Sequence, residues 1–143
     1  MTDTAGTGED AATTPFEWDH FLQLAEEWSV DPRQAVLRSA ISRAYYAAYI
    51  PACNKNLAKR NFNDLAREVR RRNPKAGSHD VTWGAYGVSG QRLSRRVSEL
   101  GQRMKDRRIG ADYEDETMFR ASHQLVRATI NDAREVIKSL RVL

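Results

Sequence analysis

The side chains best suited to chemistry in this chain are arginines and histidines in short motifs. The segment RNPKAGSH begins at Arg72 and ends at His79, with six residues between them. A guanidinium holds a phosphate through two parallel hydrogen bonds, and an imidazole changes its charge near neutral pH. The two side chains are therefore candidates for chemistry at a phosphate: if the pair forms a site, Arg72 is the phosphate clamp and His79 the acid–base group.

A second candidate arginine follows a helical stripe of apolar residues between Leu93 and Met104, which recur at spacings of four, three and four. Continuing that stripe predicts that Arg107 or Arg108 faces the groove of a helical bundle, and we take Arg108 as a candidate catalytic residue. His123 falls on the apolar seam of the last predicted helix. It is either a core histidine or a catalytic partner of a groove-facing arginine.

Four carboxylates, those of Asp112, Glu114, Asp115 and Glu116, follow Arg108 after a gap of three residues. Acids at a helix N-terminus complement the helix dipole, and an inward arginine needs a carboxylate or phosphate partner. We therefore predict a structural ion pair between Arg43 and Asp112. The carboxylates are contiguous and lack a second set of ligands, so we predict neither a metal site nor a cofactor.

The charge of the chain favours a polyanionic partner. It has 143 residues and a net charge of +4, and its first fifteen residues hold three of the nineteen acids and none of the 23 bases. The remainder has 23 bases against sixteen acids, a net +7. This favours nucleic acid as a partner, and the candidate contacts are Arg43, Arg103, Arg107 and Tyr113.

Composition predicts one domain in a reducing compartment. Residues 1–15 have the polar, acidic composition of a disordered tail, and residues 16–143 are long enough for a single core. The lone Cys53 excludes an intramolecular disulfide. We expect a cytoplasmic protein without a membrane partner, because no segment has the pattern of a signal peptide or a membrane span.

The elements that must position these side chains are helices. Thr14 to Glu17 predicts a capping box that opens the first helix, and Asp31 to Gln34 repeats it before a second helix that runs from Pro32 to about Leu57. Pro51 predicts a kink or an early stop near Ile50. A short helix is predicted over 62–72, and the first two helices form an antiparallel pair.

Between that short helix and the two long C-terminal helices, the four glycines of residues 77–90 predict a flexible loop. Trp83 and Tyr86 within it are interpreted as loop anchors or, if exposed, as rings that stack on RNA bases. The last helix is predicted from about Thr117 to Leu140, with Phe119 and His123 on its core seam. Its arginines at intervals of seven, from Arg120 to Arg141, form either a solvated face or an RNA track.

The segments RSAISRAYYAAY, from Arg38 to Tyr49, and RRIGADY, from Arg107 to Tyr113, resemble the HEPN family of small helical bundles. Many HEPN proteins are ribonucleases, or RNA-binding partners of minimal nucleotidyltransferases in prokaryotic toxin–antitoxin and defence loci. The resemblance covers most of residues 16–143. It implies an all-α fold, an antiparallel four-helix bundle with an additional short helix, and a homodimer.

The same resemblance implies metal-independent RNA cleavage by an Arg and a His with four to six residues between them, in a site shared by two copies. RRIGADY has no histidine, and Asp112 stands where the shortest motif would place it relative to Arg107. The sequence therefore leaves open whether the protein is an endoribonuclease. The alternatives are a catalytically inactive adaptor for a nucleotidyltransferase or a larger defence complex, and a nucleotide-binding domain using Arg107, Arg108 and Tyr113.

Overall fold

The computed structural model describes residues 14–143, and these form six helices and no strand. The predicted all-helical class is confirmed over this part of the chain. The predicted tail lies outside the described residues except for Thr14 and Pro15. The helices are α2 (Asp19–Trp28), α3 (Gln34–Leu57), α4 (Phe62–Arg72), α5 (Ser78–Val88), α6 (Arg92–Tyr113) and α7 (His123–Leu140).

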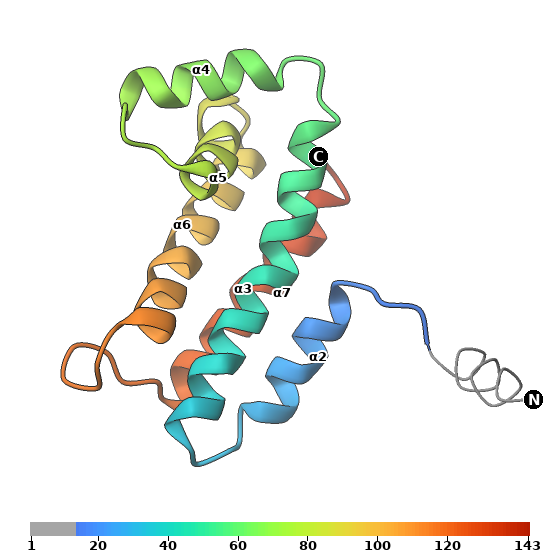
Figure 1. The fold of residues 1–143 in the computed structure, drawn as a ribbon. Helices are drawn as coiled ribbons and strands as arrows, with labels where there is room; N and C mark the ends of the chain where they lie inside the picture. Colours follow the sequence, from blue (N-terminus) through green and yellow to red (C-terminus); the bar gives the residue numbers. More distant parts are fainter. Residues whose placement is uncertain (1–13) are drawn as a thin grey trace, which may run out of the picture.

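Helix α3 is the centre of the fold and packs against α2, α5, α6 and α7. Figure 1 shows α2 and α3 side by side and running in opposite directions. The alanines of α3, among them Ala40, Ala44 and Ala48, have no exposed surface, and their small side chains let the neighbouring helices approach closely. The main core therefore surrounds one alanine-rich helix.

Helix α4 belongs to a second, smaller core. Ala66 and Val69 of α4 pack with Val81 of α5, and half-buried Phe62 and Val88 complete this cluster. Figure 1 shows α4 lying across one end of the molecule, next to α5. The prediction of this short helix is confirmed, including both of its ends.

Both predicted helix starts near the N-terminus are wrong. Helix α2 begins at Asp19 rather than at Pro15, and no side chain caps it. His20 Nδ1 accepts the backbone N–H of Glu17 at 3.2 Å, and Phe16 packs edge to face on Trp18 and Phe21. These contacts hold residues 16–18 outside the helix. Helix α3 likewise begins at Gln34, without a side-chain cap.

Of the two alternatives predicted near Ile50, a kink or an early stop, the early stop is wrong, because α3 continues through Pro51 to its predicted end at Leu57. A proline inside a helix costs roughly 3 kcal/mol, since it lacks an N–H and its ring meets the preceding turn. Ala47, Ala48 and Ala52 around it are completely buried. Tertiary packing on both sides of Pro51 therefore outweighs the local cost.

The predicted loop at residues 77–90 is instead helix α5, and its glycines serve close packing. A Cβ atom at Gly84 would lie 2.8 Å from a methyl carbon of Val69 on α4. Trp83 and Tyr86 have no exposed surface, so they are anchors, as interpreted, but on a helix. Their burial excludes the alternative of stacking on RNA bases.

The boundary between the last two helices lies later than predicted. Helix α6 continues to Tyr113, so RRIGADY is helical, and α7 begins at His123, where the Ser122 hydroxyl accepts the N–H of Leu125 at 3.0 Å. His123 is exposed in the first turn of α7, not on its core seam. Arg120 precedes the helix and does not belong to the predicted ridge.

Arg38 holds the chain between these two helices. Its guanidinium donates to the carbonyls of Gly110, Ala111, Glu114 and Phe119, the last at 2.7 Å. Carbonyls at the end of a helix lack intrahelical partners, and a cation there also complements the helix dipole. One arginine of α3 thus caps α6 and fixes the turn that leads to α7.

Candidate functional site

Helix α5 places His79 against a row of tyrosines on α3. The His79 ring stacks on Tyr49, with 4.0 Å between ring centroids and 8° between their planes. Its Nδ1 lies 2.6 Å from the Tyr45 hydroxyl, which also accepts the indole N–H of Trp83 at 3.0 Å. That hydroxyl can donate to Nδ1 of a neutral imidazole or accept from a charged one. His79 is thereby held in one orientation in both protonation states.

Arg108 of α6 approaches the same tyrosines. Its guanidinium carbon lies 5.3 Å from the ring centroid of Tyr45 and 5.7 Å from that of Tyr46. Arg108 is only 8% exposed. Among the described residues its one ion pair, with Asp112, is long at 3.7 Å, and its Nε has no hydrogen-bond partner. A buried charge is costly unless it is paired and hydrogen-bonded. Arg108 is therefore an incompletely paired charge in this cluster.

The electrostatics of the cluster favour a neutral His79. Partial burial lowers the pKa of His79 below its ordinary 6.5, the charges of Arg108 and Lys105 lower this pKa further, and Asp80 opposes them. Lys105 is ion-paired with Asp80, which follows His79 in α5. Because the pKa is lowered, the imidazole is uncharged at neutral pH and can accept a proton.

The structure brings together His79 and Arg108, but not the predicted pair of Arg72 and His79. The Arg72 Nε donates to Glu68 on its own helix at 2.8 Å, and Arg72 makes no ion pair or hydrogen bond with His79 among the described residues. His123 lies elsewhere, with its Nδ1 2.7 Å from the carbonyl oxygen of Ser29.

The predicted ion pair of Arg43 with Asp112 is absent from the described residues. The Arg43 guanidinium lies over the ring of Phe21, 4.8 Å from its centroid. Asp112 instead pairs with Arg108, four residues earlier on the same helix, and accepts the Ser42 hydroxyl at 3.4 Å. The continuation of α6 to Tyr113 explains the difference, because it places Asp112 one turn after Arg108.

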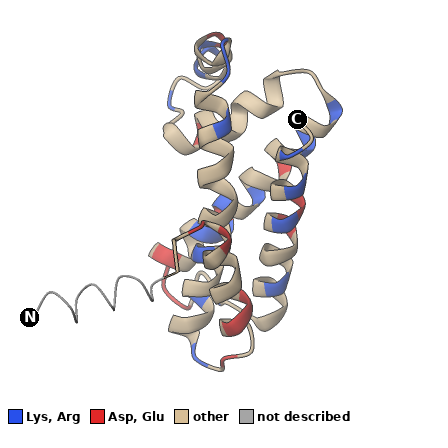
Figure 2. Ribbon diagram, turned by 90° about the vertical axis from the view of Figure 1, so that its right-hand side faces the viewer, with Lys and Arg blue, Asp and Glu red and all other residues tan. Residues whose placement is uncertain are grey.

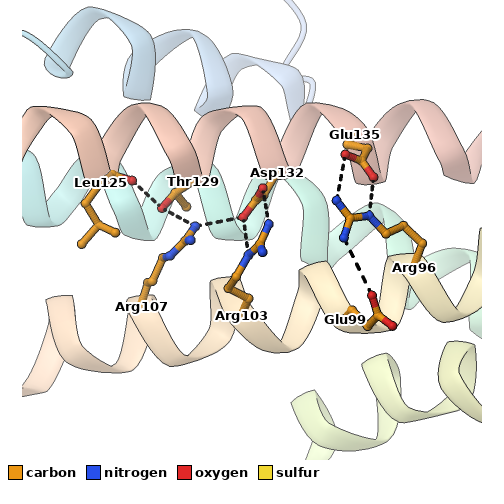
Figure 3. A network of polar contacts seen from close by, with 8 residues as sticks. All are labelled: Arg96, Glu99, Arg103, Arg107, Leu125, Thr129, Asp132 and Glu135. Atoms are coloured by element: carbon orange, nitrogen blue, oxygen red, sulfur yellow. Dashed lines mark hydrogen bonds and ion pairs between the residues drawn. The ribbon is translucent and has the colours of Figure 1, made fainter.

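Two predicted RNA-binding arginines are engaged in a network between α6 and α7. Figure 3 shows Arg103 and Arg107 converging on Asp132 of α7, with Arg103 bidentate at 2.9 and 3.0 Å and Arg107 at 2.9 Å. Arg96 of α6 likewise donates to a residue of α7, from its Nε to the Glu135 carboxylate at 2.8 Å. These contacts join the two helices, and they leave Arg107 mostly buried. Tyr113, by contrast, is 76% exposed at the end of α6.

The spacing of Tyr45 and Tyr49 in the sequence indicates a shared helical face, although neither tyrosine was predicted as a site residue. The two are four residues apart on α3, so their rings lie on one face and receive His79 together. The pairing of Lys105 with Asp80 could not be predicted from local sequence patterns, because it joins α5 to α6 across 25 residues. The site is thus a half-buried cluster of one imidazole, three tyrosines and an incompletely paired arginine.

The described part of the chain is an all-helical protein in which a half-buried histidine and a buried, incompletely paired arginine approach the same tyrosines. Comparisons with protein-family models, with curated proteins and with solved structures gave no match for the chain. None of the described helices is long and apolar enough to span a membrane. Over residues 14–143 no group of three or more His, Cys, Asp and Glu side chains is placed to hold a metal ion.

Proposed function

We propose that this protein is a HEPN-like, RNA-directed protein of a prokaryotic toxin–antitoxin or defence system that cleaves RNA without a metal ion. The observation that carries the proposal is the buried Arg108 guanidinium, with an unpartnered Nε, at the same tyrosines as His79. In this proposal α2, α3, α6 and α7 form the antiparallel four-helix bundle, within one cytoplasmic domain of residues 16–143 that works as a homodimer.

The proposed reaction uses groups that the cluster supplies. A phosphodiester of RNA binds to Arg108, which stabilises the charge that builds on the phosphate oxygens. Neutral His79 accepts the proton of the 2′-hydroxyl at Nε2, and the 2′-oxygen attacks phosphorus. The bond to the 5′-oxygen breaks, and that oxygen takes a proton from water, while the imidazole of His79 later returns its own proton to the solvent. The products are a 2′,3′-cyclic phosphate and a 5′-hydroxyl.

The adaptor remains as a second candidate because of one surface at the end of α6. Tyr113 is 76% exposed, and Ile109, which is 36% exposed, lies one turn before it on the same helix. Exposed apolar side chains grouped in this way are typical of protein-binding surfaces. An inactive bundle would use this surface to bind a nucleotidyltransferase or a defence complex.

The test of the nuclease is an incubation of the protein with a mixed tRNA and mRNA pool in EDTA. We expect fragments that end in 2′,3′-cyclic phosphates, and we expect Arg108→Gln to form them about 10²–10³-fold more slowly, because one phosphate contact is lost. Arg95→Gln, which removes an exposed charge elsewhere on α6, is the matched control. RNA left intact by the wild type would overturn the nuclease and favour the adaptor.

A further inference from the structure

The basic charge of the chain is concentrated around helix α4. Residues 59–75 contain seven Lys and Arg against two Asp and Glu, a net +5 out of the +7 of residues 16–143. Both acids are already paired inside α4, Asp64 with Arg67 and Glu68 with two arginines. The remaining exposed bases, which have no ion pair or side-chain hydrogen bond among the described residues, are Arg60, Arg70 and Lys75.

The apolar face of α4 is not available to a partner. Ala66 and Val69 are buried against α5, and no large apolar side chain of α4 is among the exposed ones. A helix that binds a membrane surface inserts an exposed apolar face, which α4 lacks. Figure 2 shows Lys and Arg on this helix at the top of the molecule. The exposed part of α4 therefore suits a polyanion that is bound through charge alone.

A groove lies between α4 and α5, the helix that carries His79. It has a volume of about 300 Å³ and lies between α4, α5 and α6, where its polar lining comes from Arg72, Asn73, Asp80 and Gln102. Asp80 directly follows His79, and it binds Lys105, which lies one turn before Arg108 on α6. The groove therefore lies on the same helix as His79 and borders Arg72 of α4.

We propose that α4 is a docking helix for the phosphate backbone of the RNA that is cleaved at His79 and Arg108. This inference rests on the proposed function and adds a second binding surface to it. Contacts to phosphates position a strand without reading its sequence. Helix α4 therefore supplies affinity and orientation, and the His79 cluster carries out the cleavage.

The test compares two variants that each remove three exposed bases, Arg60→Gln/Arg70→Gln/Lys75→Gln at α4 and Arg95→Gln/Arg127→Gln/Arg141→Gln elsewhere. Fluorescence anisotropy measures their affinity for a single-stranded RNA whose 2′-O-methyl groups prevent cleavage. We expect the α4 variant to bind roughly tenfold more weakly and to lower the slope of log affinity against log salt by roughly 2, at about 0.7 per phosphate contact. The second variant should bind nearly as the wild type does.

Further controls distinguish the loss of charge from a loss of folding, and RNA from other anionic ligands. Arg60→Lys/Arg70→Lys keeps the charge and should bind as the wild type does. Equal losses of RNA affinity in both glutamine variants would overturn the inference, and so would a wild-type protein that does not bind RNA. Binding to anionic phosphatidylserine vesicles that depends on α4, without binding to RNA, would also overturn it. Binding of RNA through α4 without any cleavage would overturn the nuclease and leave this inference intact. RNA cleavage by the wild type, together with an unchanged RNA affinity in the α4 variant, would overturn this inference and leave the nuclease intact.

Discussion

His79→Ala is expected to lower the rate of RNA cleavage in EDTA by about 10²–10⁴-fold, the usual contribution of a positioned acid–base group. His79 is the histidine that the structure places with a buried, incompletely paired arginine. Its ring is held by the Tyr45 hydroxyl and the Tyr49 ring, so the imidazole is already oriented for proton transfer. The rate should be measured with saturating RNA, so that a change in affinity does not enter it.

The other two histidines provide the matched controls for that experiment. His20 bonds the backbone of Glu17, and His123 bonds the carbonyl of Ser29, both away from the tyrosines. His20→Ala and His123→Ala should keep the wild-type rate. His79→Gln, which keeps a polar group beside Tyr45, separates a loss of chemistry from a loss of folding. An unchanged rate in His79→Ala, or a large loss in His123→Ala, would contradict the assignment.

The largest expected effect on stability comes from Gly101→Ala. A Cβ atom at Gly101 would lie 2.1 Å from ring carbons of Trp83, which is completely buried and cannot move without disturbing the core. Overpacking costs 1–3 kcal/mol or more, and displacement of Trp83 also breaks its hydrogen bond to Tyr45. The gain in helix propensity offsets about 1 kcal/mol. We expect a net loss of about 2–4 kcal/mol in the free energy of unfolding.

Urea denaturation followed by circular dichroism measures this loss. Gly77→Ala is the control, because a Cβ atom there meets no atom within 4 Å. We expect the control to stay within about 1 kcal/mol of the wild type, the usual range for an exposed N-cap position. Gly101→Ala with the stability of the wild type would show that α5 and α6 can separate, and the close packing described here would then be wrong.

The parts of the fold that local patterns determine were predictable from the sequence. Helix α4 was predicted at both ends because its apolar spacing and the Asn73–Pro74 stop lie within the segment itself. Helix α5 was not predicted, since its glycines indicate a loop unless one knows that Val69 of another helix packs on Gly84. The end of α6 was missed for a similar reason, because the arginine that caps it, Arg38, comes from α3.

The individual residues of the site were predictable from local sequence patterns, whereas their association, which depends on tertiary structure, was not. The helical stripe predicted that Arg107 or Arg108 faces the groove, and His79 was singled out as an acid–base candidate. The association of Arg108 with His79 was not predicted, because the structure joins them across 29 positions through Tyr45 of a third helix. Sequence spacing instead paired His79 with Arg72, whose partner is the nearby Glu68.

The most direct test of a shared phosphate site at Arg108 and His79 is an NMR titration of His79 with and without an uncleavable 2′-O-methyl RNA. In the free protein its pKa lies below 6.5, because of burial and the charges of Arg108 and Lys105. A phosphate bound at Arg108 offsets that charge and favours the protonated ring. We predict that RNA raises the pKa of His79, and that it does so less in Arg108→Gln. A pKa of His79 that bound RNA leaves unchanged would contradict the account.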